Sequence, residues 1–514
     1  MRLLIGRGCY VDDLVLPNQA RGFVLRSPHP HARIASIDTG AASRLPGVLL
    51  ILTGADVATD KLKPIPLMPH ALSPPDIALY NVDGSDLLVE RPAVLAMEEV
   101  RHIGEAVAFI VADTVEQARD AAEAVVVVYD LLPPISLIAV DARTGQPPAT
   151  RAGFAEAEHV VQLSAFIPRH AGASIEPPGA LGSFDGATGR TTLEIGGGAV
   201  ARPKELAWIL GLEPEDVQVN AREAPNDNGP RSYVDPEVVL VAWAARKLGR
   251  PVKWTGERGD AFDDARVGFH VEAELAVSAD GCLRGLHGTN TGDVGAYTVS
   301  YVPLTRSTEL MTSLYRLPAV VRARAVMSNA APDVPRYGVE SPETLLLMER
   351  LIDMAARDTG IDRVELRRRN LIATLPHRNV FGVTYDAGDY AGSPDEALRL
   401  SDWNGYGERE QRSEARGLKR GRGLAADVAS KAAFDSTATA SYASGWQVCE
   451  VEVDPETGEV RIDRLTLVDE ARHGPAAIAN AIVDALSDYG VTHIDMPCSP
   501  ERVWRAIRGC RIDK

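Results

Sequence analysis

Short apolar segments typical of β-strands alternate along the chain with helices whose ends are marked by capping residues. Ala106–Ala112 is an uninterrupted apolar run, and Thr114 follows it as the cap of a helix. Farther along, Asp235 and Pro236 open a second helix that Gly249 closes, which is the usual placement of Pro inside a helix start and Gly past its end. This pattern predicts an α+β fold of mixed sheets and helices.

The composition argues against nucleic acid or an anionic membrane as the main partner. The chain has 514 residues and a formal net charge of −17, so it has room for several domains but lacks the excess of basic residues that such partners require. The longest apolar stretch, Ala124–Val140, is interrupted by Asp130 and by Pro133–Pro134. It falls short of the ~20 apolar residues that a membrane span needs.

The cysteine pattern gives no sign of a metal centre. The five cysteines are scattered, and no two of them have the C-x-x-C spacing. The sequence therefore offers no zinc or iron–sulfur motif and no predicted metal ligands, and it fits a reducing compartment such as the cytoplasm. The cysteines are Cys9, Cys282, Cys449, Cys498 and Cys510.

Shifts in composition divide the chain into three regions. Residues 7–135 form an α+β unit that ends near Pro133–Pro134. Residues 152–387 mix strands with well-capped helices, whereas residues 388–514 hold a Gly- and charge-rich segment, an Ala/Ser/Thr stretch, a β-hairpin and two helices. The last region has too little material for a large independent domain, and we expect it to be the remnant of one.

Three groups of segments resemble one protein family. The first group contains GRGCYVDDLVLPNQARGFVLRSPHPHARIASID and RHIGEAVAFIVADTVEQARDAAEAVVVVYDLLP, the second EPPGALGSFDGATGR and VDPEVVLVAWAARKLGRPVKW, and the third VCEVEVDPETGEVRIDRLTLVDE and PAAIANAIVDALSDYGVTHIDMPCSPERVWRAI. Together they resemble the molybdopterin-binding large subunit of the xanthine dehydrogenase, aldehyde oxidase and aerobic carbon monoxide dehydrogenase family. The match covers most of the chain in the family's order, so it is more specific than a single short motif.

The resemblance implies an N-terminal α/β hammerhead domain over residues 7–135, a first molybdopterin-binding domain over residues 152–387 and a shortened second one over residues 388–514. It implies a molybdopterin cofactor, for example in its cytosine dinucleotide form, and hydroxylation of an aldehyde or N-heterocycle with oxygen from water. Electrons would leave through FAD-binding and 2Fe-2S subunits on separate chains. The missing C-x-x-C spacings agree with that division of labour.

The loops expected to hold the cofactor depart from the family's pattern. A pterin pyrophosphate needs clustered backbone N–H donors, which glycines at turns and helix starts provide. Where the family has a Gly-rich loop before helix 236–248, this chain reads EAPNDNGPRSYVD, with Gly229 as the one glycine and two prolines that remove donors. Upstream, Gly196, Gly197 and Gly198 are candidate cofactor ligands, and a flexible strand-to-helix turn explains them equally well.

Two further loops carry the remaining candidates. In VPRYGVESPE, Arg336, Tyr337 and Gly338 partly keep the family's pattern, and Arg336 is either a partner for substrate or pterin phosphate or a surface arginine in a turn. The family's general base lies in a Gly-x-Gly-Glu turn before the helix that opens here at Pro475. The segment that carries the base looks deleted, so the nearest carboxylate, Glu470, is the candidate catalytic base or merely the end of a strand.

The scaffold and the loops therefore predict different functions. The scaffold predicts a molybdenum hydroxylase large subunit. The altered loops predict a catalytically inactive, cofactor-free scaffold or assembly protein, and a defective or artificially shortened sequence is a third interpretation. Loss of sheet interior before Pro475 also predicts poor packing and exposed apolar faces around residues 420–475.

Overall fold

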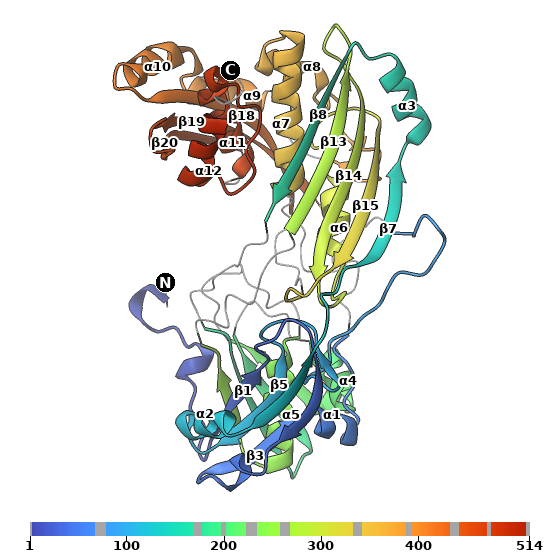
Figure 1. The fold of residues 1–514 in the computed structure, drawn as a ribbon, viewed down its shortest axis with the longest axis vertical. Coiled ribbons are helices and arrows are strands. Elements are labelled where there is room, and N and C mark those ends of the chain that lie inside the picture. The colour runs from blue at the N-terminus through green and yellow to red at the C-terminus, as the bar shows by residue number, and fades with distance from the viewer. Residues whose placement is uncertain are drawn as a thin grey trace.

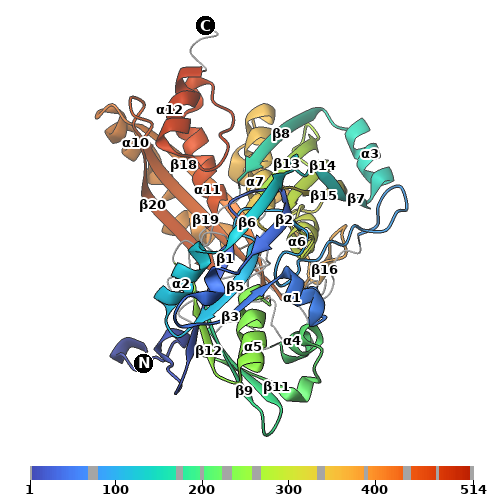
Figure 2. The ribbon, with the colours of Figure 1, turned by 60° about the horizontal axis from the view of Figure 1, so that its bottom comes forward.

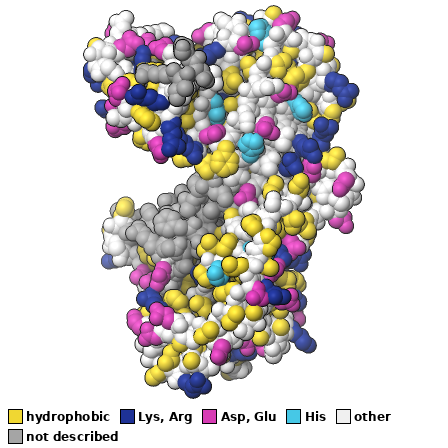
Figure 3. Space-filling view, viewed as in Figure 1, with side chains coloured by type: hydrophobic (Ala, Val, Ile, Leu, Met, Phe, Trp, Pro, Cys, Tyr) yellow, Lys and Arg dark blue, Asp and Glu magenta, His cyan; other side chains and the backbone are white. Residues whose placement is uncertain are grey.

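The structure is a computed structural model that describes residues 3–66, 79–168, 177–196, 202–222, 234–257, 268–332, 342–386, 390, 392–431, 441–469 and 474–509. Figure 1 shows two lobes: strands and helices from the N-terminal half form the lower lobe, and a five-stranded sheet with the C-terminal elements forms the upper one. Charged side chains of both signs are scattered over the face in Figure 3, which is indented below the C-terminal elements. None of the described helices is both long enough and apolar enough to span a membrane.

The lower lobe is built on a seven-stranded sheet that joins strands from the first and second regions of the sequence. Its strand order is β11-β10-β9-β12-β1-β5-β3, so β1 pairs with both β5 and β12. A smaller sheet has the order β4-β2-β6. Helix α5 packs on β9 and contacts α4, which lies near it in Figure 2. The elements are β1 (Ala20–Arg26), β2 (Ala32–Asp38), β3 (Val48–Thr53), α1 (Gly54–Thr59), β4 (Glu99–Val100), β5 (Ala106–Ala112), α2 (Val115–Glu123), β6 (Val126–Leu131), β9 (Gly179–Asp185), β10 (Arg190–Ile195), α4 (Pro203–Leu210), β11 (Val217–Ala221), α5 (Pro236–Leu248) and β12 (Val252–Thr255).

Helices in this lobe begin and end at the capping residues that the sequence indicates. At the start of α2, the Thr114 hydroxyl accepts a hydrogen bond from the Gln117 N–H, and the Gln117 side chain accepts one from the Thr114 N–H. Helix α5 starts at Pro236 and is followed by Gly249, whose φ of 63° is left-handed and suits glycine. The predicted α+β class is confirmed.

The five-stranded sheet of the upper lobe has the order β7-β15-β14-β13-β8. Helix α7 contacts β8 and β13, and its Leu347, Met348 and Leu351 are fully buried against this sheet's core. A short hairpin, β16-β17, follows α8 in the chain. The elements are β7 (Leu137–Gly145), α3 (Pro147–Ala155), β8 (His159–Ile167), β13 (Gly268–Val277), β14 (Leu283–Gly295), α6 (Val302–Glu309), β15 (Ala319–Met327), α7 (Pro342–Thr359), α8 (Arg363–Asn370), β16 (His377–Arg378) and β17 (Thr384–Tyr385).

The C-terminal elements form a three-stranded antiparallel sheet, β18-β19-β20, with α11 packed against β18 and β19. Leu424, Trp446 and Val451 of this sheet are each 0% exposed. The predicted poor packing around residues 420–475 is therefore wrong for the described residues of that stretch. The elements are α9 (Ser393–Leu400), α10 (Tyr406–Glu414), β18 (Lys419–Lys431), β19 (Ser441–Val453), β20 (Val460–Asp469), α11 (Pro475–Ala485) and α12 (Pro500–Gly509).

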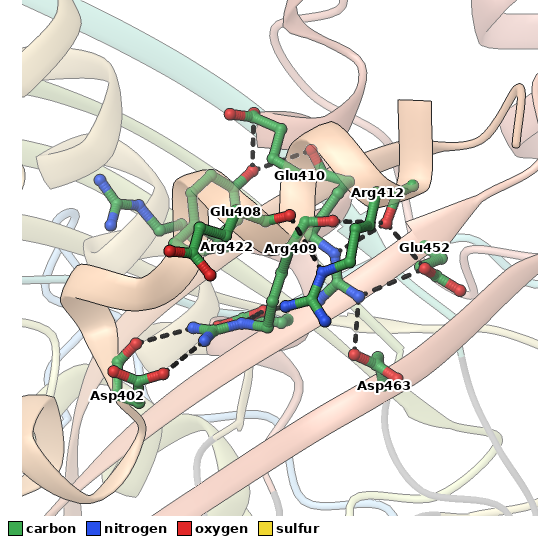
Figure 4. Close-up of polar contacts among 12 residues, drawn as sticks. Asp402, Glu408, Arg409, Glu410, Arg412, Arg422, Glu452 and Asp463 are labelled. Atoms are coloured by element: carbon green, nitrogen blue, oxygen red, sulfur yellow. Dashed lines mark hydrogen bonds and ion pairs between the residues drawn. The ribbon is translucent and has the colours of Figure 1, made fainter. Parts of the chain in front are cut away.

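Polar contacts fasten these elements together. Figure 4 shows the contacts between α10 and the C-terminal sheet, where Arg409 pairs with Asp402 at 2.6 Å and with Glu450 of β19 at 2.7 Å. Between α7 and α11, the buried Arg350 donates to the Asn480 side-chain oxygen at 2.7 Å. The C-terminal elements are therefore joined to the five-stranded sheet through α7 by buried, directional contacts as well as by apolar packing.

Replacing Gly423 by Ala should lower the free energy of unfolding by about 2 kcal/mol, because overpacking forces the backbone to move. A Cβ at Gly423 would lie 2.0 Å from the Ala477 carbonyl oxygen of α11, and backbone cannot rotate away as a flexible side chain can. Gly407→Ala in α10 is the matched control, because a Cβ there meets nothing within 4 Å. This control should leave stability unchanged or raise it by up to about 1 kcal/mol in urea unfolding. Equal destabilisation by both changes would contradict the close approach.

Candidate active-site pocket

A pocket of about 150 Å³ lies where the first region of the chain meets the second. Its walls come from residues 104–106 at the start of β5, residues 235–237 at the start of α5, Trp254 of β12 and Tyr297, which follows β14. Arg26 at the end of β1 also lines it. The pocket thus draws on elements from both lobes.

Glu105 and Tyr297 form a buried pair in the wall of this pocket. The Tyr297 hydroxyl donates to Glu105 Oε1 at 2.5 Å, and the Arg101 backbone N–H donates to Glu105 Oε2 at 2.6 Å. The Arg101 guanidinium lies 5.5 Å from the centre of the Tyr297 ring. Burial and then the Glu105 charge raise the pKa of Tyr297 far above its ordinary value, so Tyr297 keeps its proton and acts as a hydrogen-bond donor.

A second polar pair ties β1 to α5 at the pocket. Arg26 Nη2 donates to Glu237 Oε1 at 2.8 Å, and Arg26 Nη1 donates to the Gly104 carbonyl oxygen at 3.1 Å. Glu237 is buried in the first turn of α5. The pair therefore holds the start of α5 against the end of β1. Backbone N–H groups at a helix start lack acceptors within the helix.

The side chains of the pocket suit a ligand with N–H donors better than one with a phosphate. Among the described lining residues, Glu105, Asp235 and Glu237 bring three carboxyl groups, against Arg26 and His102 as the basic groups. Ionised carboxylates are acceptors only, and each offers several lone-pair sites. The edge of a pterin carries N–H donors that such carboxylates can accept. A volume of about 150 Å³ is smaller than the ~300 Å³ at which ligand pockets begin, so these residues form only part of a site for a pterin.

Most of the predicted site residues lie outside the described residues: Gly197, Gly198, Arg336, Tyr337, Gly338 and Glu470. Gly196 is described. It is buried directly after β10, whose Ile195 carbonyl accepts a hydrogen bond from the Arg222 N–H at 2.9 Å. Gly196 is not among the residues that line the pocket.

The described residues that flank two of the predicted loops nevertheless meet at the pocket. Asp235 follows the loop at residues 223–233, and Ala331 and Pro332 precede the loop that contains Arg336. Gly295 lets residue 331 come close to the segment after β14. It has a φ of 78°, and a Cβ there would lie 2.4 Å from the Ala331 carbonyl oxygen. A glycine is required there, and it brings residue 331 beside the segment that leads to Tyr297.

No sequence motif points to Glu105, Tyr297 or Arg26. The chain separation between Glu105 and Tyr297 is 192 residues, so only the tertiary fold pairs them. The one local signal was the Pro236 start of α5, which placed Glu237 in the first turn of a helix. Among the described residues, no group of three or more His, Cys, Asp or Glu has the geometry of a metal site.

Tyr297→Phe should lower the free energy of unfolding by about 1–3 kcal/mol, because it leaves the buried Glu105 carboxylate without one of its donors. Tyr80→Phe is the control, since Tyr80 is 77% exposed. Denaturant unfolding of both variants measures the difference. A loss for Tyr297→Phe no larger than that for Tyr80→Phe would show that the pair does not stabilise the pocket.

Two family models match the stretches of the chain that meet at this pocket. Residues 5–133 match the family model described as the aldehyde oxidase and xanthine dehydrogenase a/b hammerhead domain. Residues 134–371 match the model described as the molybdopterin cofactor-binding domain. The pocket lies between these two matched stretches, since Arg26 and Glu105 belong to the first, and Glu237 and Tyr297 belong to the second.

Individual relatives point to the same class. The gamma subunit of the 6-hydroxypseudooxynicotine dehydrogenase complex of Paenarthrobacter nicotinovorans is 30% identical over 455 residues, which is 82% of this chain and 56% of that relative. The carbon monoxide dehydrogenase large chain of Hydrogenophaga pseudoflava is 29% identical over 444 residues, 78% of this chain and 53% of the relative. The chain thus spans about half the length of the curated relatives it matches.

The fold agrees with a solved structure of quinoline 2-oxidoreductase from Pseudomonas putida 86, with a TM-score of 0.87, 19% identity and coverage of 99% of this chain and 97% of that one. A hammerhead domain followed by a molybdopterin cofactor-binding domain defines the class as molybdopterin-binding large subunits. The chain belongs to the xanthine dehydrogenase, aldehyde oxidase and carbon monoxide dehydrogenase family of such subunits, as the resemblance in the sequence predicts.

Proposed function

We propose that this chain is the large subunit of a molybdenum hydroxylase that oxidises an aldehyde or an aromatic N-heterocycle with oxygen from water. The observation that carries the proposal is the pocket lined by Glu105, Glu237 and Tyr297, at the junction of the two matched domains. When bound, the molybdenum cofactor would supply the oxygen-transfer and redox chemistry. Two of the relatives act on nicotine or a nicotine derivative by their names, which favours an N-heterocycle.

The described residues would contribute to binding and orientation. The Glu105 and Glu237 carboxylates would accept hydrogen bonds from N–H groups of the pterin, and Arg26 holds Glu237 in place. We propose that Gly196, Gly197, Gly198, Arg336, Tyr337 and Gly338 complete the cofactor site and that Glu470 is the general base. The cytosine dinucleotide is the proposed form of the cofactor.

The electron-transfer partners are proposed from the family. Relatives are named as a gamma subunit and as large chains, so they work within complexes. FAD-binding and 2Fe-2S subunits would accept the electrons from this chain, which we propose acts in the cytoplasm.

We further propose that residues 388–514 are a shortened second molybdopterin-binding domain. A structural match that spans 97% of one neighbour, beside sequence matches that cover about half of the relatives, supports shortening inside the chain. The three-stranded sheet and α11 would be what this domain retains.

The test is oxidation by the purified, cofactor-loaded chain of a panel of aldehydes and N-heterocycles in heavy-oxygen water, with a dye as electron acceptor. The proposal predicts heavy oxygen in the product and a lower turnover for Glu237→Gln. Glu257→Gln is the control, because Glu257 lies on the surface with its side chain 62% exposed. Product without heavy oxygen, or no turnover by protein that contains the cofactor, would contradict the proposal.

A further inference from the structure

A second pocket, of about 330 Å³, lies at the opposite end of β15 from the candidate active site. Leu317 and Pro318, which directly precede β15, line this second pocket, whereas Ala331 and Pro332, a few residues beyond its end, line the first. A nine-residue strand is roughly 30 Å long, so the two pockets are separate. Residues of the β16 strand form another wall.

The lining of this pocket is positively charged. Its described lining residues include Arg316, Arg378 and His377, and none of them is Asp or Glu. Within the part of the chain that the structure describes, neither arginine has a carboxylate partner; Arg378 uses its Nε to donate to the Gly382 carbonyl oxygen at 3.2 Å. A cationic pocket on a chain with a net charge of −17 runs against the overall charge. Burial and then the charge of Arg316 lower the pKa of His377, as expected where cations gather.

The cationic wall is held in place by Asn379, a buried residue that itself lines the pocket. The Asn379 side-chain oxygen accepts hydrogen bonds from the N–H groups of Phe381 and Val383, each at 3.0 Å, and its amide donates to the Glu309 carbonyl oxygen at 2.8 Å. These bonds close the β16-β17 hairpin and fix it to the end of α6. His377 and Arg378 are thus presented on a rigid turn, which lowers the entropic cost of binding a ligand.

The segment opposite this hairpin holds hydrogen-bonding groups without partners. Thr312 lines the pocket and is 1% exposed, and its hydroxyl has no hydrogen-bond partner among the residues that the structure describes. The next residue, Ser313, also has an unpaired buried hydroxyl and a φ of 47°, an uncommon conformation for a residue other than glycine. Buried unpaired polar groups and strained backbone cost free energy, and both concentrate at binding sites.

Apolar side chains complete the pocket. Tyr315, Leu317 and Val380 line it beside the cationic groups. A volume of about 330 Å³ is within the range of small-molecule sites, which begin at ~300 Å³, and exceeds what a bare inorganic ion fills. The lining therefore suits a molecule with an apolar body and one anionic group.

We propose that this pocket binds a small organic anion, with its carboxylate or phosphate between Arg316 and Arg378 and its apolar body against Leu317 and Val380. Arginine is suited to such a group because its guanidinium donates two parallel hydrogen bonds to a carboxylate or phosphate. An oxygen of the ligand also gives the Thr312 hydroxyl the acceptor it lacks after rotation of that side chain. The proposal does not depend on the proposed function, because no residue of the active-site pocket takes part.

The test is isothermal titration calorimetry of the full-length chain with benzoate and with phenyl phosphate, at constant ionic strength. We expect saturable binding of at least one of these probes, and we expect Arg316→Gln and Arg378→Gln each to weaken it about tenfold or more. The matched control is Arg505→Gln, whose side chain is 71% exposed in α12. The control should bind as the unchanged chain does. Which probe binds more tightly distinguishes a carboxylate from a phosphate ligand.

Benzamide, which has the shape of benzoate without its charge, serves as the second control and should not bind. Binding of benzoate that is equal in the unchanged chain and in both arginine variants would overturn the proposal, and so would equal binding of benzamide. Absence of saturable binding of both anions would overturn it as well. Circular dichroism and thermal unfolding of each variant show that a loss of binding is not a loss of folding.

Discussion

Replacing Arg367 by Ala should lower the free energy of unfolding of this chain by about 3–5 kcal/mol, because breaking a buried ion pair leaves its partner charged and unpaired. Arg367 and Glu349 are both 0% exposed, and the guanidinium Nη2 lies 2.8 Å from Glu349 Oε2. Arg367 Nη1 also lies 2.8 Å from Asp353, so the change leaves two buried carboxylates without their main cation. Arg367 further donates to the Leu424 carbonyl oxygen of β18 at 3.1 Å, which joins α8 to the C-terminal sheet.

The neighbouring residue provides the control for this prediction. Arg368 is on the same helix, but its side chain is 42% exposed and pairs with Asp395 at the surface. Arg368→Ala should change the free energy of unfolding by about 1 kcal/mol or less. Equilibrium unfolding in urea, followed by circular dichroism, measures both. The account fails if the two variants are destabilised equally.

Glu450→Ala should lower the free energy of unfolding by about 3 kcal/mol, because it removes the carboxylate that two buried arginines share, Arg409 of α10 and Arg420 of β18. Glu450 Oε2 lies 2.6 Å from Arg420 Nη1, and both Glu450 oxygens accept from Arg409. The effect should fall at the lower end of the range for buried pairs, since Arg409 keeps Asp402 and Arg420 keeps Asp463, as Figure 4 shows for these acidic partners.

Glu459→Ala is the control for this second change, because Glu459 is exposed in the turn between β19 and β20. It should alter the unfolding free energy by less than about 0.5 kcal/mol. Thermal unfolding should show a clear drop in Tm for Glu450→Ala alone. A Tm for Glu450→Ala that matches that of the control would mean that the remaining acidic groups compensate fully.

The fold was predictable where local chemistry decides it. The start of α2 at Thr114, the start of α5 at Pro236 and its end before Gly249 each depend on one or two residues near a helix terminus. Strand β18 was not predicted, because its segment is rich in glycine and charged residues, and these residue types are uncommon in β-strands. The structure supplies the reason: Gly421 and Gly423 let the backbone of α11 approach, a requirement set by tertiary packing.

The prediction of poor packing failed for a related reason. The sequence showed apolar strands with little material to cover them, but the positions of α7, α9 and α11 against the C-terminal sheet could not be inferred from it. For the candidate site, the sequence predicts cofactor loops from glycines before helix starts, and most residues of that prediction lie outside the described residues. The pairing of Glu105 with Tyr297, and of Arg26 with Glu237, depends on how distant segments meet, which no local pattern encodes.

The central claim, that this chain holds a molybdopterin cofactor at the junction of its two matched domains, is tested most directly by the molybdenum and pterin content of the purified protein from a host that makes molybdopterin. Our account predicts near-stoichiometric molybdenum and pterin in the unchanged chain, and a lower content in Glu237→Gln than in Glu257→Gln. Folded protein that contains neither molybdenum nor pterin would contradict the account and would instead indicate a cofactor-free scaffold derived from this family.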